Sequence, residues 1–211
     1  VGVVAIDPTS PFSGGALLGD RIRMQNLSTD AGVYIRSMAT RGTLGGLARA
    51  TADAVKVLDA SGKDVVFVET SGAGQSEVDV IKVAHTILVV MAPGLGDDIQ
   101  ASKAGMMEIG DIFIVNKADR DNADRAVEEI QAMIELGAQE GRWRPPVIKT
   151  TASSGRGTEN VIEKIEEHAD YLNRTSAREI LVHRSEIELA EALKYRLTDR
   201  LMAEVRKDSN F

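Results

Sequence analysis

The sequence predicts an α/β fold, in which a mostly parallel sheet is flanked by helices and followed by a helical extension at the C-terminal end. Over residues 1–172, short apolar runs alternate with segments of helical periodicity, which is the pattern of an open α/β sheet. Nearly every residue of these runs is apolar, as expected for parallel strands that helices cover on both faces. After residue 172 no further strand pattern occurs.

Six strands and six helices are expected before the extension. The strand patterns fall at residues 1–6, 33–36, 64–68, 86–91, 112–115 and 147–149. The helical patterns fall at residues 20–27, 44–59, 77–84, 99–109, 122–136 and 158–171. Ligands of open α/β sheets bind outside the carboxyl ends of the strands, and Asp7, Glu69 and Asn116 each follow an apolar run directly. These three residues are therefore the first candidates for a functional site.

Residues 173–211 predict one long amphipathic helix. Apolar residues recur there at helical spacing: Ile180, Leu181, Ile187, Leu189, Leu193, Leu197, Leu201 and Val205. Such a stripe must be buried, either on the preceding domain or on a second copy of the chain. We expect a domain at residues 1–172 and a dimerisation arm at residues 173–211, which makes the protein a homodimer. A last helix packed on the parent domain is the alternative.

The composition argues against a membrane protein and against a nucleic-acid-binding protein. The chain has 211 residues, 43% of them hydrophobic, which is enough for a sizeable core. The longest apolar runs are of strand length, so no membrane span is expected. The net charge of −7 and the lack of a basic block argue against a nucleic-acid surface. The chain contains no cysteine, which suits a reducing compartment, and we expect a soluble cytoplasmic protein. It begins without an initiator Met or a signal-peptide pattern, which indicates an internal start.

The strongest chemical motif is Asn116-Lys117-Ala118-Asp119, directly after the apolar run 112–115. A carboxylate at Asp119 can accept hydrogen bonds from N1–H and from the N2 amino group of guanine together, a contact that adenine cannot make. Asn116 can reach N7, and the Lys117 stem can cover the ring. The motif predicts a guanine-binding site, with an ordinary surface turn as the alternative.

A second loop is expected to serve the same base. Thr151 and Ala152 follow the last predicted strand and open the polar segment 151–157. This segment can present a backbone N–H to guanine O6, and it can equally form the first turn of the helix that follows.

Two carboxylates near the first strand are candidates for Mg²⁺. Asp7 ends that strand, and Asp20 follows the glycine-rich segment 14–19. Mg²⁺ keeps part of its hydration shell and takes few protein carboxylates. A mobile loop that carries such an Asp also suits a nucleotide-sensing switch. The alternatives are an Asx turn at Asp7 and a helix N-cap at Asp20.

Residues 69–77 predict contact with phosphate. Gly72 and Gly74 allow the backbone to approach a phosphate group closely. Glu69 is expected to complete the Mg²⁺ shell or to order the attacking water. Gln75 is a candidate for positioning that water, although it also suits the start of the next helix.

Other features of the sequence are less informative about function. No GxxxxGK[ST] phosphate loop occurs in the 211 residues, so we expect the chain by itself to be inactive as a hydrolase. The three histidines, His85, His168 and His183, lack metal-ligand spacing and are expected to be solvated or locally hydrogen-bonded. Trp143 is expected to anchor the loop before the last strand.

In their order along the chain, these motifs resemble those of the methylmalonyl-CoA mutase-associated GTPases, the MeaB/ArgK group. The segments that carry the resemblance are DPTS at 7–10, GGALLGDRIRM at 14–24, RGTLGG at 41–46, ETSGAGQSE at 69–77, NKAD at 116–119 and WRPP at 143–146. Each motif alone is common, whereas the combination is specific. It covers residues 1 to 172, and Thr151-Ala152 stands where the family usually has Ser-Ala.

The resemblance implies a SIMIBI-class phosphate-loop GTPase that uses Mg²⁺ and binds GTP and GDP. By position, it implies Mg²⁺-associated carboxylates at Asp7, Asp20 and Glu69. It implies guanine recognition by Asn116, Lys117 and Asp119. It also marks residues 93–103 as an additional switch, with Asp97 and Lys103 in the positions that transmit the mutase signal. For those two residues, solvated surface charges are the alternative.

We therefore expect a GTPase chaperone that assists an adenosylcobalamin-dependent acyl-CoA mutase, of the methylmalonyl-CoA mutase type, in cofactor loading and protection. Two alternatives remain. One is a non-catalytic dimerising interaction module. The other is a nickel-delivery GTPase, which is disfavoured because the chain has no Cys and no clustered His.

Overall fold

A computed structural model of the chain describes all six predicted strands and three of the predicted helices. The described residues are 1–7, 24–27, 29–39, 46–70, 83–94, 107, 109–137, 142–174, 189–190, 193, 196–198, 200 and 201. The predicted helices at 20–27, 77–84 and 99–109 lie largely outside them, and a short 3₁₀ helix, η1 (Gln25–Leu27), occupies the end of the first. The chain forms two compact units, Val1–Ala84 with Val182–Phe211, and His85–Leu181.

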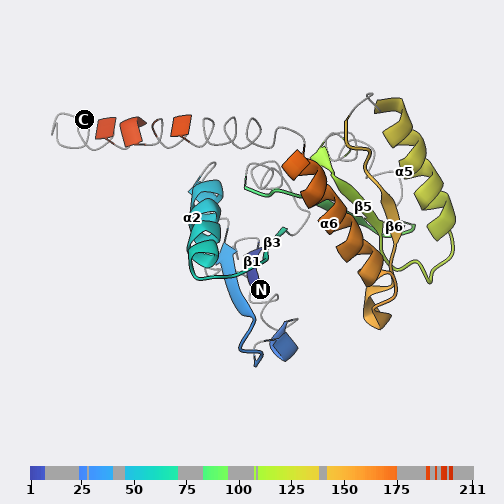
Figure 1. Cartoon of the computed structure of the whole chain (residues 1–211), viewed down its shortest axis with the longest axis horizontal. Helices are drawn as coiled ribbons and strands as arrows, with labels where there is room; N and C mark the ends of the chain where they lie inside the picture. The colour runs from blue at the N-terminus through green and yellow to red at the C-terminus, as the bar shows by residue number, and fades with distance from the viewer. Residues whose placement is uncertain are drawn as a thin grey trace, which may run out of the picture. The chain divides into compact units, whose positions relative to one another are not determined.

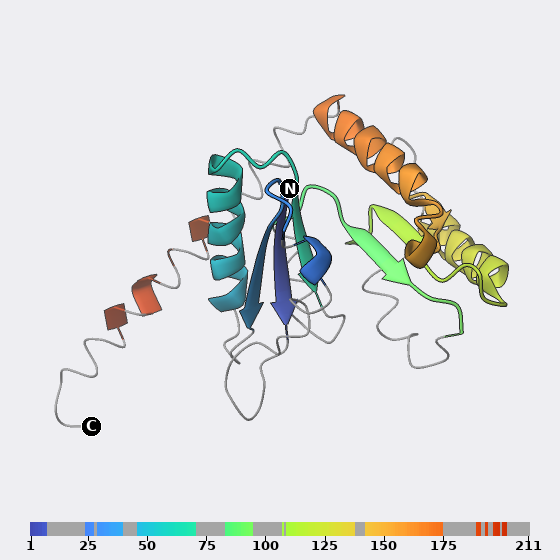
Figure 2. The same cartoon turned by 90° about the horizontal axis from the view of Figure 1, so that it is seen from below.

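The first unit contains a three-stranded parallel sheet. Its strands are β1 (Gly2–Asp7), β2 (Tyr34–Ala39) and β3 (Val66–Thr70), in the spatial order β2-β1-β3. Figure 2 shows β1 between its two neighbours, with all three strands running the same way. The register pairs Gly2 of β1 with Tyr34 on one side and with Val66 on the other.

Helix α2 (Gly46–Ala60) lies beside this sheet (Figure 2). Leu58 is buried, and a Cβ atom at Gly2 would lie 3.0 Å from its Cδ1 atom, so the glycine allows close packing of helix and strand. Val4 and Ala5 of β1 are fully buried, as the central position of this strand requires.

The second unit contains another three-stranded parallel sheet, formed by β4 (Leu88–Met91), β5 (Ile112–Val115) and β6 (Val147–Lys149) in this order. Two helices cover it, α5 (Ala123–Gly137) and α6 (Thr158–Arg174), which Figure 1 shows on either side of the sheet. All four residues of β5 are buried, which explains its uninterrupted apolar sequence.

The side chains of β5 alternate between two apolar clusters. Phe113 and Val115 pack with Ile130 of α5. Ile112 and Ile114 pack with Val161 and Ile165 of α6. Because successive residues of a strand point to opposite faces, α5 and α6 pack on opposite faces of the sheet.

The predicted α/β class with parallel strands and flanking helices is confirmed. Within each of the two units, the three described strands pair as a parallel sheet. Periodicity identifies strands, but it carries no signal for which strands are neighbours. No helix formed by the described residues is long and apolar enough to cross a membrane.

The described residues of the C-terminal segment are helical. They are Leu189, Ala190, Leu193, Arg196, Leu197, Thr198, Arg200 and Leu201. The leucines at positions 189, 193, 197 and 201 are 61%, 53%, 61% and 62% exposed. Their spacing of four residues puts them along one side of a helix, as the sequence predicted.

Candidate nucleotide-binding site

Two polar loops leave the carboxyl ends of β5 and β6 in the unit His85–Leu181. The N–H of Thr150 donates to the carbonyl oxygen of Val115 (2.9 Å), and the N–H of Ala118 donates to that of Thr150 (3.0 Å). These bonds continue the pairing of the two strands beyond the sheet. The loop after β5 therefore lies beside the loop after β6, and the predicted guanine-binding residues of both come together.

Asn116 is held by the second loop. Its Oδ1 atom accepts hydrogen bonds from Thr150 Oγ1 (3.2 Å) and from the backbone N–H of Ala152 (3.1 Å). Because a backbone N–H can only donate, the amide oxygen must face Ala152, and this assigns the orientation of the carboxamide. The Asn116 amino group has no acceptor among the described residues, so it is available to donate to an acceptor such as N7 of a purine.

Lys117 adopts an unusual backbone conformation, with φ of 59°. For a residue with a Cβ atom, this left-handed conformation costs about 1–2 kcal/mol. The N–H of Arg120 donates to the carbonyl oxygen of Lys117 (3.1 Å) and closes the turn. Such strain is concentrated at functional positions, and the side chain of Lys117 is exposed.

Asp119 lies on the same turn and is exposed. Within the described part of the chain, its carboxylate makes no hydrogen bond or ion pair. Both carboxylate oxygens are therefore available to two donors at once, which is the arrangement that N1–H and the N2 amino group of guanine require.

The loop after β6 offers a backbone donor. It forms a short 3₁₀ helix, η3 (Ala152–Ser154), in which the N–H of Ser154 donates to the carbonyl oxygen of Thr151 (3.0 Å). The N–H of Ala152 is engaged by Asn116, whereas the described residues supply no acceptor for the N–H of Ser153. The first N–H groups of a helix lack partners within it. The sequence predicted Thr151 and Ala152 in this loop but not Ser153. The N–H groups of Ala152 and Ser153 differ only because the first is bonded to Asn116, and the sequence does not show that bond.

Two further residues were missed. Thr150 contributes both its hydroxyl group and its carbonyl oxygen to the contact between the loops. Lys149, the last residue of β6, forms an ion pair with Asp124 in the first turn of α5, with 2.6 Å between Nζ and Oδ1. Opposite charges at a strand end and a helix start are a weak signal, because such pairs are common on surfaces.

The glycines of the second loop are required by its shape. The N–H of Thr151 donates to the carbonyl oxygen of Arg156 (2.9 Å), which folds the segment back on itself. Gly155 and Gly157 have φ of 72° and 83°. A Cβ atom at Gly157 would also clash with the carbonyl oxygen of Lys149. Only glycine satisfies both conditions.

In the unit Val1–Ala84, the predicted Mg²⁺ carboxylates Asp7 and Glu69 lie on neighbouring parallel strands. Asp7 is the last residue of β1, and Glu69, paired with Ala5, is the penultimate residue of β3. Both backbone positions are thus near the carboxyl end of the sheet, and the Glu69 side chain is exposed. Carboxylate oxygens fit the preference of Mg²⁺. No group of three or more acidic, His or Cys side chains suited to a metal occurs among the described residues, and the Mg²⁺ site stays a prediction.

The remaining predicted site residues lie outside the described residues. They are Asp20, Gly72, Gly74, Gln75, Asp97 and Lys103.

Of the three histidines, the structure describes His85 and His168, and neither belongs to a group of side chains suited to a metal there. His168 is 2% exposed, and its Nδ1 atom lies 2.9 Å from Oγ1 of Thr86, 82 residues away, so it is buried and hydrogen-bonded to a distant segment. His85 is exposed, and His183 lies outside the described residues. The predicted role of Trp143 as a loop anchor is confirmed, because its Nε1 atom donates to the carbonyl oxygen of Asp111 (2.8 Å).

Comparison with known proteins identifies the family. The model of the family described as methylmalonyl-CoA mutase-associated GTPase MeaB matches residues 1–207. The chain belongs to this family. A Pyrococcus abyssi protein named as a GTPase is 60% identical over 178 residues, which are 83% of this chain and 55% of that protein. A Mycobacterium tuberculosis protein, also named as a GTPase, is 42% identical over 176 residues, which are 82% of this chain and 52% of that protein.

Two further comparisons are with a mouse protein and with a solved structure. The mouse mitochondrial protein named methylmalonic aciduria type A homolog is 40% identical over 159 residues, which are 74% of this chain and 38% of that protein. The crystal structure of an LAO/AO transport system kinase matches with a TM-score of 0.72 and 22% identity, covering 96% of this chain and 60% of that one, and it supports the fold alone. The chain spans about half the length of the curated relatives it matches.

Proposed function

We propose that the chain binds GTP and GDP and, within the whole protein, hydrolyses GTP. The observation that carries this proposal is the joint arrangement of the two loops after β5 and β6. Asn116 Oδ1 is fixed by Thr150 and Ala152, while the Asp119 carboxylate is exposed and has no partner among the described residues. Membership of a family of GTPases supports the same conclusion.

Guanine is the base that fits these groups. The Asp119 carboxylate accepts from N1–H and from the N2 amino group, the Asn116 amino group donates to N7, and the N–H of Ser153 donates to O6. Adenine has no donor at N1 or at position 2 and no O6, so it would leave the Asp119 carboxylate and the Ser153 N–H without partners, whereas its N7 still accepts from Asn116. The stem of Lys117 covers one face of the ring.

Asp7, Asp20 and Glu69 would hold Mg²⁺, which neutralises negative charge that develops on the phosphates. Glu69 or Gln75 orders the attacking water, and the backbone at Gly72 and Gly74 approaches the γ-phosphate. Asp97 and Lys103 belong to the switch that relays the nucleotide state. Hydrolysis of this kind depends on positioning and electrostatic stabilisation rather than on covalent chemistry.

The partner is an adenosylcobalamin-dependent acyl-CoA mutase, whose cofactor loading and protection the protein assists. The family description names a methylmalonyl-CoA mutase, and the mouse relative is named after methylmalonic aciduria. The protein acts as a homodimer joined through residues 173–211, next to a GTPase domain at residues 1–172. The exposed leucines of the C-terminal helix support this part of the proposal. A cytoplasmic location, expected from the cysteine-free composition, belongs to the same proposal.

The test is a change of base preference. Asn at position 119 would accept from N1–H but would donate to position 2, which matches the O2 atom of xanthine and opposes the amino group of guanine. In the full polypeptide that the gene encodes, we expect Asp119→Asn to weaken binding of GDP by at least about tenfold and to create binding of xanthosine diphosphate. Isothermal titration calorimetry with both nucleotides measures the change.

The matched control is Asp121→Asn, the same substitution at an exposed residue two positions further along the same loop. It should leave the preference for guanine intact. Equal binding of GDP and ADP by the unsubstituted protein, or an unaltered preference in Asp119→Asn, would overturn the proposal.

A further inference from the structure

The loop that carries Asp119 is fastened to β6 and its following residue at two points. Before Asp119, the N–H of Ala118 donates to the carbonyl oxygen of Thr150 (3.0 Å). After it, the Asp124 carboxylate forms the ion pair with Lys149, with 2.6 Å between Oδ1 and Nζ. The two attachment points on the β6 side are adjacent in sequence, so the segment from 118 to 124 forms a short loop closed at both ends.

Nothing else described holds the Asp119 side chain. It makes no hydrogen bond or ion pair among the described residues, so its position depends on the backbone of the closed loop. Inside that loop, a turn bond from Arg120 N to Lys117 O (3.1 Å) and the left-handed conformation of Asn122, with φ of 67°, shape the chain. Asn tolerates this conformation better than most residues. The two attachments restrict the backbone of the loop, and they therefore also restrict where the Asp119 carboxylate lies.

We propose that the ion pair between Lys149 and Asp124 is a positioning pair, which fixes the Asp119 loop for recognition of guanine. This inference rests on the proposed function of the same site. A loop that is ordered before the ligand arrives loses less conformational freedom on binding, so the pair raises affinity without touching the nucleotide. Lys149 also directly precedes Thr150, which contacts the loop after β5. Its ion pair with α5 therefore helps to fix the positions of both loops.

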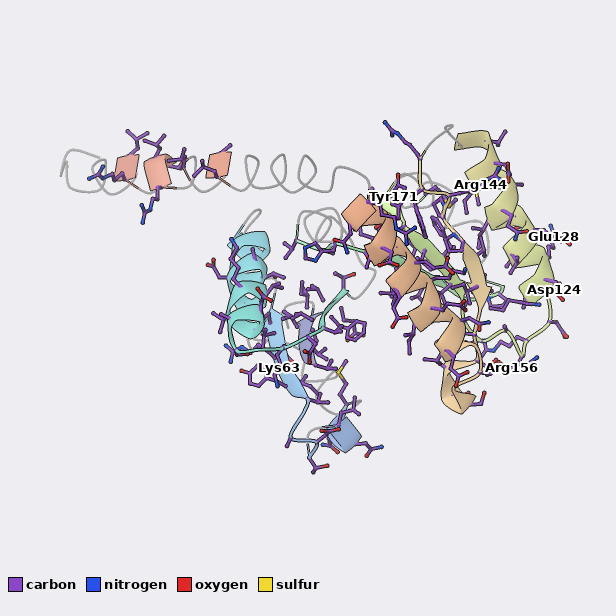
Figure 3. The ribbon with its side chains drawn as sticks, viewed as in Figure 1. Lys63, Asp124, Glu128, Arg144, Arg156 and Tyr171 are labelled. Carbon is purple, nitrogen blue, oxygen red and sulfur yellow. The ribbon has the colours of Figure 1, made fainter. Side chains whose placement is uncertain are left out.

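A second ion pair on the same helix provides a contrast. Arg144, shortly before β6, pairs with Glu135 near the end of α5, with 2.5 Å between Nη2 and Oε2. Both pairs join α5 to the β6 segment, and both are exposed, at 50% and 84% for Lys149 and Asp124 and at 65% and 60% for Arg144 and Glu135. Figure 3 shows Asp124 and Arg144 toward opposite ends of α5. Only the Lys149 pair lies at the end that carries the two loops.

Because the ion pair between Lys149 and Asp124 is exposed, its contribution to GDP affinity should be small. Exposed pairs are worth about 0.2–1 kcal/mol, which corresponds to a change in affinity of up to about fivefold. In the full polypeptide, Lys149→Met should therefore raise the dissociation constant of a fluorescent GDP analogue about two- to fivefold. Lys149→Arg, which keeps the charge, should restore most of the affinity. The difference between the unsubstituted protein and Lys149→Met should shrink in 1 M salt, because salt screens exposed charges.

A double-mutant cycle tests whether the pair acts through Asp119. If it does, Lys149→Met should cause a much smaller loss of GDP affinity in an Asp119→Ala background than in the unsubstituted protein. Asp124→Asn should lower the GDP affinity as much as Lys149→Met does. The double variant should lose no more GDP affinity than either single variant. Arg144→Met is the matched control, and it should leave the affinity unchanged.

The possible outcomes separate this inference from the function on which it rests. If the unsubstituted protein prefers GDP to ADP but Lys149→Met binds GDP equally well, the positioning role is overturned and the proposed function stands. An equal loss of affinity in Lys149→Met and Arg144→Met, or an undiminished loss in the Asp119→Ala background, also overturns it. If the unsubstituted protein binds no GDP, both proposals fail.

Discussion

The imidazole ring of His168 packs against the indole ring of Trp143, with ring centroids 4.8 Å apart and an interplanar angle of 55°. His168 Nε2 lies 3.4 Å from Asp111 Oδ1, and Trp143 Nε1 donates to the carbonyl oxygen of Asp111. Thr86, Asp111 and Trp143 precede β4, β5 and β6, whereas the two loops of the proposed base site follow β5 and β6. The cluster therefore joins α6 to the sheet at the end opposite the proposed base site.

His168→Ala should destabilise the protein without changing its preference for guanine. The substitution removes a buried ring together with its contacts to Thr86 and Asp111, and we expect a loss of about 2–4 kcal/mol in the free energy of unfolding. Urea unfolding followed by tryptophan fluorescence measures the loss directly, because Trp143 is the single tryptophan of the chain. The ratio of GDP to ADP affinity of the folded fraction should stay constant.

His85→Ala is the control, since His85 is an exposed histidine of the same unit. It should change the free energy of unfolding by less than about 0.5 kcal/mol. If His168→Ala is as mild as His85→Ala, the cluster contributes little to stability.

Gly157→Ala should disrupt the loop after β6. The new Cβ atom would meet both a φ of 83° and the carbonyl oxygen of Lys149. Gly155→Ala meets only the first condition, because its φ is 72° and nothing lies within 4 Å of its Cβ position. For Gly155→Ala we expect the free energy of unfolding to fall by about 1–2 kcal/mol, which is the cost of the left-handed conformation alone. For Gly157→Ala we expect a clearly larger fall.

Thermal or urea unfolding of the two variants ranks these costs. The GDP affinity should fall more in Gly157→Ala, since a displaced loop also moves the N–H groups of Ala152 and Ser153. Equal stability of the two variants would contradict the argument that close approach to Lys149 requires a glycine.

Local patterns in the sequence were sufficient for the elements around the base site. The uninterrupted apolar run of β5 followed by Asn116 predicted a buried strand and the loop after it, because a parallel strand covered on both faces has no polar position. The helices predicted at 122–136 and 158–171 begin within one residue of α5 and α6 as described. In each case the signal is periodicity within a single segment.

Interactions between distant segments could not be predicted. Thr86 and His168 are 82 residues apart, and nothing near either one indicates that the imidazole is buried. The same limit applies to Ser153, because the engagement of the Ala152 N–H by Asn116 spans 36 residues. Strand pairing is also a long-range property, and periodicity within one segment does not indicate that β1 lies between β2 and β3.

Two substitutions at Asn116 should separate its two roles. Asn116→Asp keeps an oxygen that accepts from Thr150 and Ala152 but loses the amino group, so we expect nearly unchanged stability and a loss of GDP affinity of about tenfold or more. Asn116→Ala removes both functions. It should also destabilise the loops by about 1–3 kcal/mol, because the Ala152 N–H loses its acceptor.

Calorimetric titration with GDP and urea unfolding of both variants provide the comparison. If Asn116→Asp binds GDP normally, the amino group of Asn116 makes no contact with the base. If Asn116→Ala is as stable as the unsubstituted protein, the bonds from Thr150 and Ala152 do not hold the loops together.

The leucines of the C-terminal helix should determine the oligomeric state. Leu193 and Leu197 are more than half exposed, one helical turn apart, and burying a leucine contributes about 1.5–3 kcal/mol. If these residues form the dimer interface, the double substitution Leu193→Lys and Leu197→Lys removes two such contributions from each protomer. We expect the dissociation constant of the dimer to rise by more than about a hundredfold. Sedimentation velocity at micromolar concentrations then shows a monomer in place of a dimer.

Leu136→Lys is the matched control, because Leu136 on α5 is 89% exposed and belongs to no leucine stripe. It should leave the dimer intact. A monomeric unsubstituted protein would show that the stripe serves another contact, and a double variant that remains dimeric would place the interface elsewhere. Base preference should be the same in the monomeric variant, since Asn116 and Asp119 belong to one compact unit of one chain.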